Sequence, residues 1–180
     1  MLVLSKMIID RPVMSLRTGR QVALSYAAII NPNNLKIEGF HCTDSFDKKK
    51  HLVLVTQDIR DVLPAGLVVD DHSDLSEPED LIRLSKTINL GFDVIGKTVV
   101  TTKKKRIGKV SDYAIEPESM IIKKLYVSQS IVKSLTGGTL SVDRTQIVEI
   151  TNKKIIIKEL LQPLKAEPAT GPSLNPVIAA

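Results

Sequence analysis

The stretch that decides the fold runs from Lys103 to Val127 and reads KKKRIGKVSDYAIEPESMIIKKLYV. It predicts a basic turn, a strand, a tight turn at 116–119 and a returning strand, because a Pro–Ser turn separates two runs rich in β-branched residues. A version of this pattern occurs 85 residues earlier: the segment 30–35, INPNNL, corresponds to 115–120, IEPESM. The chain is therefore predicted to contain two copies of one small β unit.

Both copies carry the same break in the alternation of their returning strand. Leu35 and Ile37 share one face of a strand, whereas Phe40 and Cys42 fall on the other face. The second copy slips in the same way between residues 122 and 125. A repeated slip predicts a β-bulge, and the alternative is that both faces of these strands are partly covered.

The composition favours aliphatic β cores. Apolar residues make up 43 % of the 180 residues, aromatic residues only 3 %, and tryptophan is absent. Short runs of Val, Ile and Leu separated by turns are typical of strands in small barrels or sandwiches. The predicted fold is all-β, with two tandem small barrels.

One helix is predicted between the copies. Ser76 is its expected N-cap, Glu79 completes a capping box, Leu84 and Ile88 form an apolar stripe, and Gly91 ends it. Its expected role is to join and pack the two barrels. A helical turn is also expected at 128–135.

The predicted domain boundaries follow from the repeat and from a change in composition near the C-terminus. Four of the nine prolines lie in the last 18 residues, which predicts a disordered tail. The expected parts are a first barrel at 1–72, a linker with the helix at 73–91, a second barrel at 92–162 and the tail at 163–180.

The second copy resembles the PRC-barrel family. The matching residues are 106–113, RIGKVSDY, then 124–127, KLYV, with 96–99, GKTV, as the opening strand and 141–147, SVDRTQI, as a later segment. In the first copy Ala23 and Leu24 stand where Gly-Lys would be, and Ala27 stands where the acidic residue would be. The assignment of the first copy to a barrel of this family therefore depends on the internal repeat.

The resemblance implies a small, highly curved β-barrel in each copy and a non-catalytic docking role. The family includes the cytoplasmic domain of the photosynthetic reaction-centre H subunit and the C-terminal domain of ribosome maturation factor M. Both use the barrel as a docking surface.

The net charge of +5 is unevenly distributed. Residues 1–90 carry 11 Lys/Arg and 12 Asp/Glu, whereas residues 91–180 carry 14 and 8, so the positive excess lies in the second half. An anionic partner is therefore expected there. The candidate binding residues are Lys103, Lys104, Lys105, Arg106, Lys109, Lys123 and Lys124.

The basic cluster has an alternative explanation, because charged turns also keep edge hairpins from pairing with other chains. Aromatic stacking partners in the hairpin are limited to Tyr113 and Tyr126, which weakens a role in binding single-stranded nucleic acid.

No catalytic motif is found, so an enzyme, a metal and a cofactor are not expected. The sequence has no Gly-rich phosphate loop, no His-Glu-x-x-His and no Gly-x-Ser-x-Gly. His41, His51 and His72 lack a ligand pattern, and an isolated role for His41 is favoured over a metal role. Asp112 is either a buried functional carboxylate or, as favoured here, a solvent-facing residue or one that caps a backbone amide.

The function predicted from the sequence is a cytoplasmic, non-enzymatic adaptor module that docks on a protein partner. The alternative is an RNA- or ribosome-associated assembly factor that contacts its partner through the basic second barrel. No apolar run approaches the roughly 20 residues that a membrane-spanning helix needs, so no transmembrane segment is expected.

Overall fold

The computed structural model describes residues 1–129 and 138–159, which form an all-β fold with one α-helix. The strands of the first half are β1 (Val3–Leu4), β2 (Arg11–Ser15), β3 (Gln21–Asn31), β4 (Lys36–Asp44), β5 (His51–Val55), β6 (Asp61–Leu63), β7 (Gly66–Val69) and β8 (Leu75–Ser76). Its helical segments are the 3-10 turns η1 (Ser5–Met7), η2 (Thr56–Asp58), η3 (His72–Asp74) and η4 (Pro78–Asp80), and then α1 (Ser85–Leu90). The second half contains β9 (Thr98–Thr101), β10 (Arg106–Glu116), β11 (Ile121–Ser128), β12 (Thr139–Asp143), η6 (Arg144–Gln146), β13 (Ile147–Ile150) and β14 (Lys154–Ile157).

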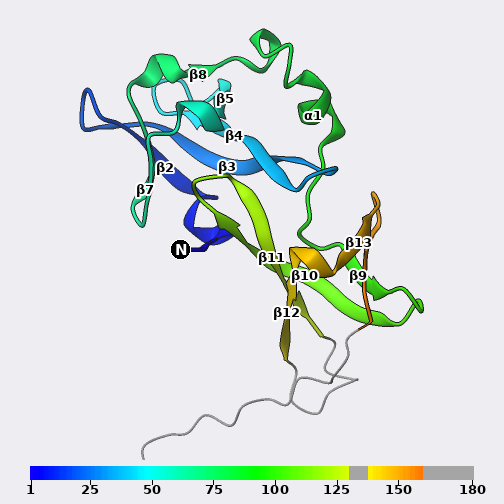
Figure 1. The fold of residues 1–180 in the computed structure, drawn as a ribbon. Helices are drawn as coiled ribbons and strands as arrows, with labels where there is room; N and C mark the ends of the chain where they lie inside the picture. The colour runs from blue at the N-terminus through cyan, green and yellow to red at the C-terminus, as the bar shows by residue number, and fades with distance from the viewer. Residues whose placement is uncertain (130–137, 160–180) are drawn as a thin grey trace, which may run out of the picture.

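The two halves repeat one pattern of strand pairing (Figure 1). In the first half β2 pairs antiparallel with β3 and parallel with β7, while β4 pairs with β3 and β5. In the second half β9 pairs antiparallel with β10 and parallel with β14, while β11 pairs with β10 and β12. The offset between matching strands rises from 85 at β3 and β10 to 88 at β5 and β12, which fits the three-residue insertion that reconciles the sequence repeat.

The predicted bulge is confirmed in both halves. The register of the β3–β4 ladder shifts so that Glu38 is the extra residue, and the β10–β11 ladder shifts at the equivalent place, Lys123. Because the bulge changes which face the following residues occupy, both Ile37 before it and Phe40 after it are fully buried.

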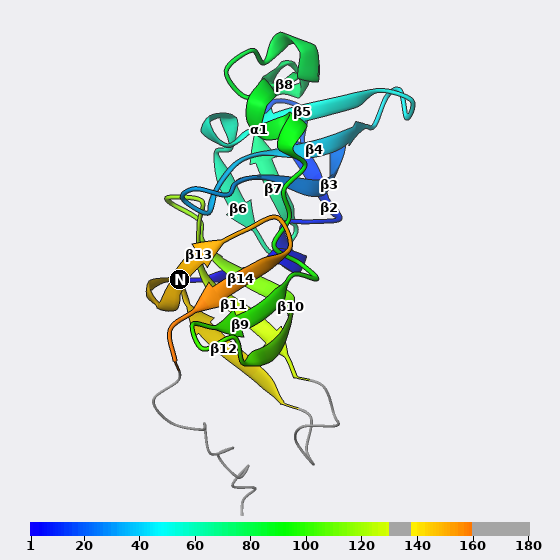
Figure 2. The same ribbon diagram turned by 90° about the vertical axis from the view of Figure 1, so that its right-hand side faces the viewer.

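The strands form one sheet with free ends. The main path runs β13-β14-β9-β10-β11-β4-β3-β2-β7-β6, and Figure 2 shows β14 beside β13 and β9. The sheet is not closed among the described residues, so the two barrels stay a prediction.

The halves share main-chain hydrogen bonds and a core. Ile37 donates its N–H to the Met120 carbonyl (2.8 Å), and Ile122 donates its N–H to the Leu35 carbonyl (2.9 Å). In addition, β1 of the first half pairs with β10 of the second. One buried apolar cluster therefore extends through both halves.

The predicted linker helix was wrong at its start. Ser76 belongs to β8, where it pairs with Val53, and it caps no helix. Leu75, next to it, is buried against β5, and this tertiary contact overrides the local capping pattern. Capping boxes occur instead at η3 and η6.

The end and the apolar stripe of the helix agree with the sequence. Gly91 has a left-handed conformation at the C-cap of α1, and Leu84 and Ile88 pack with Ile29 of β3 and Val53 of β5. The sequence predicts that the helix packs between the two barrels. In the structure it packs on the first half. The helical turn predicted at 128–135 lies mostly, and the tail at 163–180 entirely, outside the described residues.

Candidate binding faces

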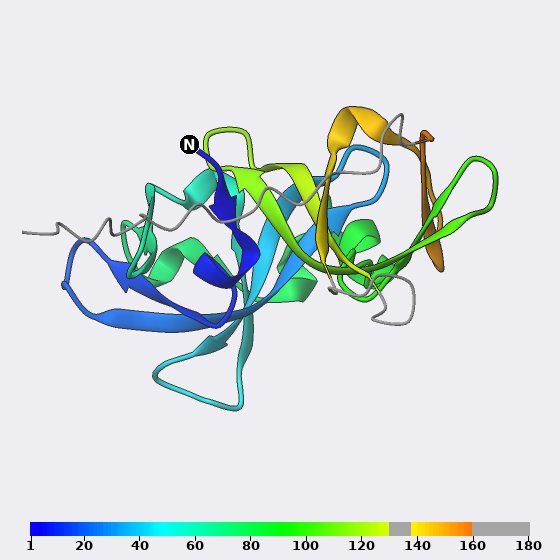
Figure 3. The same cartoon turned by 90° about the horizontal axis from the view of Figure 1, so that it is seen from below.

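The basic turn joins β9 to β10 and projects from the second half beyond β14 (Figure 3). It is closed by main-chain bonds between Thr101 N–H and the Lys105 carbonyl (2.9 Å), and between Lys104 N–H and the Thr101 carbonyl (2.9 Å). Its four basic side chains, Lys103–Arg106, are exposed. None of them forms an ion pair within residues 1–129 and 138–159.

The carboxylate of Glu159 supports this turn through the backbone. It accepts hydrogen bonds from Lys103 N–H (2.9 Å) and from the Thr102 hydroxyl (3.3 Å). Hydrogen bonding from the Thr101 side chain, followed by that from Lys103 N–H, lowers the pKa of Glu159. The lowered pKa favours the ionised carboxylate, which holds the turn through the backbone while the lysine side chains stay exposed.

The outer surface of β9, β10 and β14 extends the basic turn into a wider surface. Lys109 and Lys154 flank Thr98, each as its direct cross-strand partner, and Arg106 lies opposite Val100 one row further on. Lys158 follows β14 and is exposed. We call this surface the cationic face, and its members are Lys103, Lys104, Lys105, Arg106, Lys109, Lys154 and Lys158.

Two of the predicted site residues do not join the cationic face. Lys124 is the cross-strand partner of Ala114, eight residues along β10 from Arg106, which corresponds to roughly 25 Å. Its neighbour Lys123 forms an ion pair with Glu116 at 3.1 Å. The structure therefore brings together Lys103–Arg106 and Lys109 and separates them from the other two lysines.

Lys154 and Lys158 were not predicted from the sequence. They reach the cationic face through the parallel pairing of β14 with β9, which joins segments more than 50 residues apart. The internal repeat relates β14 to β7, which pairs in parallel with β2 in the same way.

The equivalent surface of the first half is apolar. It lies over β2, β3, β7 and the end of β6, and we call it the apolar face; its members are Met14, Leu16, Leu24, Leu63 and Val68. Four of these residues line a hollow of about 260 Å³, and Leu24, which does not, lies opposite Pro12 in the ladder. Leu16 is 62 % exposed and Leu63 is 43 % exposed.

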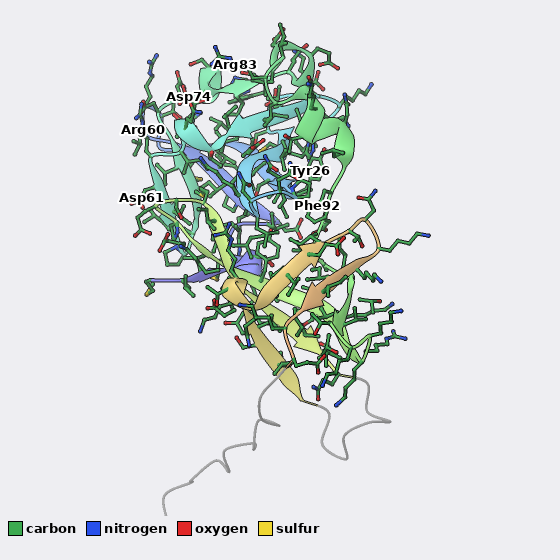
Figure 4. All side chains as sticks on the ribbon, turned by 45° about the vertical axis from the view of Figure 1, so that its right-hand side comes forward. Tyr26, Arg60, Asp61, Asp74, Arg83 and Phe92 are labelled. Atoms are coloured by element: carbon green, nitrogen blue, oxygen red, sulfur yellow. The ribbon has the colours of Figure 1, made fainter. Side chains whose placement is uncertain are left out.

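The two faces differ at most equivalent positions, although Lys105 is equivalent to another basic residue, Arg20. The ladders align Leu24 with Lys109 and Gln21 with Arg106. The offset of 88 aligns Gly66 with Lys154 and Asp70 with Lys158. Asp70 is paired with Arg60, which Figure 4 shows near Asp61 at the outer margin of the first half.

Two grooves at the junction of the halves are also related by the repeat. One, of about 480 Å³, lies between the β3–β4 turn and β13; the other, of about 400 Å³, lies between the β10–β11 turn and β6. Arg144 spans the first groove, donating from Nη2 to the Asn34 carbonyl at 2.9 Å. Both grooves carry side chains of mixed charge, so neither favours a particular ligand.

Asp112 has the structural role that was favoured from the sequence. It accepts hydrogen bonds from Tyr113 N–H (2.7 Å) and from the Ser5 hydroxyl (2.5 Å), and so it ties η1 to β10.

The histidines form packing contacts. His41 stacks on Tyr26 with ring centroids 5.8 Å apart, and His51 meets the same ring edge-on at 6.2 Å. Burial, and then the neighbouring His51, lowers the pKa of His41. Within the described part of the chain, no three His, Cys, Asp or Glu side chains are grouped to hold a metal ion.

The chain matches no protein-family model, and no curated protein is similar to it. No helix in residues 1–129 and 138–159 has the length and apolar character needed to cross a membrane.

Proposed function

We propose that the chain is a cytoplasmic, non-enzymatic docking module built from two PRC-type β-barrel units in tandem, and that it binds a protein partner through the apolar face of its first half. The repeated strand pairings support the tandem arrangement. The matching bulges at Glu38 and Lys123 support it further.

The observation that carries this proposal is the exposure of large aliphatic side chains around one hollow. Met14, Leu16, Leu63 and Val68 all line this hollow, and Leu16 and Leu63 are the most exposed of the four. Contiguous exposed apolar surface rimmed by polar residues is typical of protein interaction sites. The fold does not require this exposure, because the equivalent surface of the second half carries Arg106 and Lys109.

The experiment that tests the proposal is capture of partners from nuclease-treated lysate by the full chain, read by mass spectrometry. Leu16→Glu places a charge at the hollow, and Leu90→Glu is its matched control because Leu90 is 60 % exposed at the end of α1, away from the apolar face. We expect the wild-type protein and Leu90→Glu to retain the same protein and Leu16→Glu to lose it. Equal capture by all three would contradict docking at this face.

The second candidate function is an RNA- or ribosome-associated assembly role, which the cationic face of the second half favours. RNA or ribosomal proteins that disappear from the captured material after nuclease treatment would support this candidate over the first.

A further inference from the structure

We infer that the cationic face binds the phosphate backbone of a nucleic acid without reading its bases. This inference deepens the second candidate function and does not depend on protein docking at the apolar face. It rests on the arrangement of the basic side chains, on their taking part in no ion pair among the described residues, and on the chemistry of the surface between them.

The basic side chains lie in rows across three strands. Neighbouring strands are about 4.8 Å apart, so Lys109 and Lys154, on either side of β9, are separated by roughly 10 Å at the backbone. A nucleic-acid strand carries one negative charge per nucleotide, so a strand that crosses these rows would place phosphates beside several of the basic side chains. The flexible lysine side chains can adapt to differences in spacing.

Most of the positive charge of the face is left without a nearby carboxylate in residues 1–129 and 138–159; the exception is Lys103, whose charge acts on Glu159. None of its seven cations takes part in an ion pair within the described ranges. Two carboxylates lie at its margin: Glu149 opposite Ile156, and Glu159, which the turn backbone engages. A dense row of anions such as a phosphate backbone therefore complements this surface better than a protein surface with scattered carboxylates does.

The residue at the tip of the basic turn is a lysine, although the backbone there would be less strained with glycine. Lys104 has a φ of +63°, and the equivalent residue of the first half is Gly19, with a φ of +64°. A side chain in this left-handed region strains the backbone, whereas glycine adopts it freely. Such a residue at an exposed tip suggests that its charge serves binding.

The described side chains between the cations are poorly suited to base-specific contacts. Thr98, Val100 and Ile156 occupy it, and none of them has an aromatic ring on which a base could stack. Binding is therefore expected to depend on salt and to be insensitive to sequence, as for contacts made to phosphates alone.

The test is fluorescence anisotropy of a labelled, mixed-sequence single-stranded RNA titrated with the full chain over a range of salt concentrations. The triple variant Arg106→Gln, Lys109→Gln, Lys154→Gln should lose at least about tenfold in affinity, and its salt slope should fall by about 2, or about 0.7 for each lost phosphate contact. The control variant Arg20→Gln, Lys48→Gln, Lys49→Gln removes one arginine and two lysines from the first half. It should bind as the wild-type protein does.

A second variant separates binding from folding. Lys104→Gly removes one cation and relieves the strained turn, so it should weaken RNA binding without lowering the melting temperature. A labelled poly-glutamate peptide serves as the competing anionic probe. The inference is overturned if RNA does not bind, if both triple variants lose affinity equally, or if poly-glutamate binds as tightly as RNA at the same salt concentration.

Discussion

Leu35 and Met120 occupy equivalent positions in the two halves, and the carbonyl oxygen of each accepts a hydrogen bond from the opposite half. Both have left-handed backbones, with φ of 55° and 54°, and both are buried. The hydrogen bonds from Ile122 and Ile37 to these carbonyls are reciprocal, as in an interface between two copies related by a twofold axis. The halves thus meet as two equivalent units within one chain.

The shared core predicts that both halves unfold together. Leu35→Ala removes a buried side chain at the junction and should lower the free energy of unfolding by about 3 kcal/mol. Urea unfolding followed by circular dichroism and by tyrosine fluorescence should give one coincident transition, shifted to lower urea in the variant. Two separate transitions in the wild-type protein would show that the shared core does not couple the halves.

Gly19 and Lys104 occupy equivalent turn positions, and we expect substitutions at these two positions to change the stability of the protein in opposite directions. Gly19→Ala should destabilise the protein by about 1 kcal/mol, because a Cβ there contacts nothing within 4 Å but must adopt the left-handed conformation. Lys104→Gly should stabilise it by a similar amount. Thermal melts of both variants measure this difference, and a shift in the same direction for both would count against the strain argument.

Close backbone approach explains Gly108. A Cβ at this position would lie 2.1 Å from the Ser128 carbonyl oxygen, so Gly108→Ala should force β10 and β11 apart and cost about 3 kcal/mol. Gly138→Ala is the control, since nothing lies within 4 Å of its Cβ position. Chemical denaturation of both variants checks the difference, and equal stabilities would refute the close approach.

Burial of Cys42 predicts a loss of stability at high pH. Burial raises the pKa of this thiol from 9.0 to about 12, so the folded protein holds its proton where the unfolded chain has lost it. The buried, protonated thiol therefore contributes its full stabilisation of the folded state below pH 9, and this stabilisation is lost progressively between pH 9 and 12. The Cys42→Ala variant should show a smaller fall in melting temperature over this range, and an identical fall would contradict the assignment.

The hairpins and bulges could be predicted from the sequence because their determinants are local and occur twice. The slip between Ile37 and Phe40 is visible in the alternation of a single strand, and its repetition near Lys123 distinguishes a bulge from chance. The turn at 116–119 is likewise encoded by adjacent residues.

The remaining features depend on contacts between distant segments. The parallel pairing of β9 with β14 brings Lys154 beside Thr98, and no local pattern specifies it. Ser76 has the local pattern of a helix cap, but pairing with β5 decides its conformation. The lysines at 123 and 124 share a hairpin with the basic turn, but the length of β10 keeps them apart from it.

The most direct measurement is one capture experiment in which the two faces are disabled separately. Wild-type protein, Leu16→Glu and the triple variant of Arg106, Lys109 and Lys154 would each be recovered from lysate, and bound protein and RNA would be quantified together. We predict that Leu16→Glu loses the protein partner and keeps RNA, while the triple variant loses RNA and keeps the protein partner. Loss of both partners in each variant would contradict the separation of binding roles between the two halves.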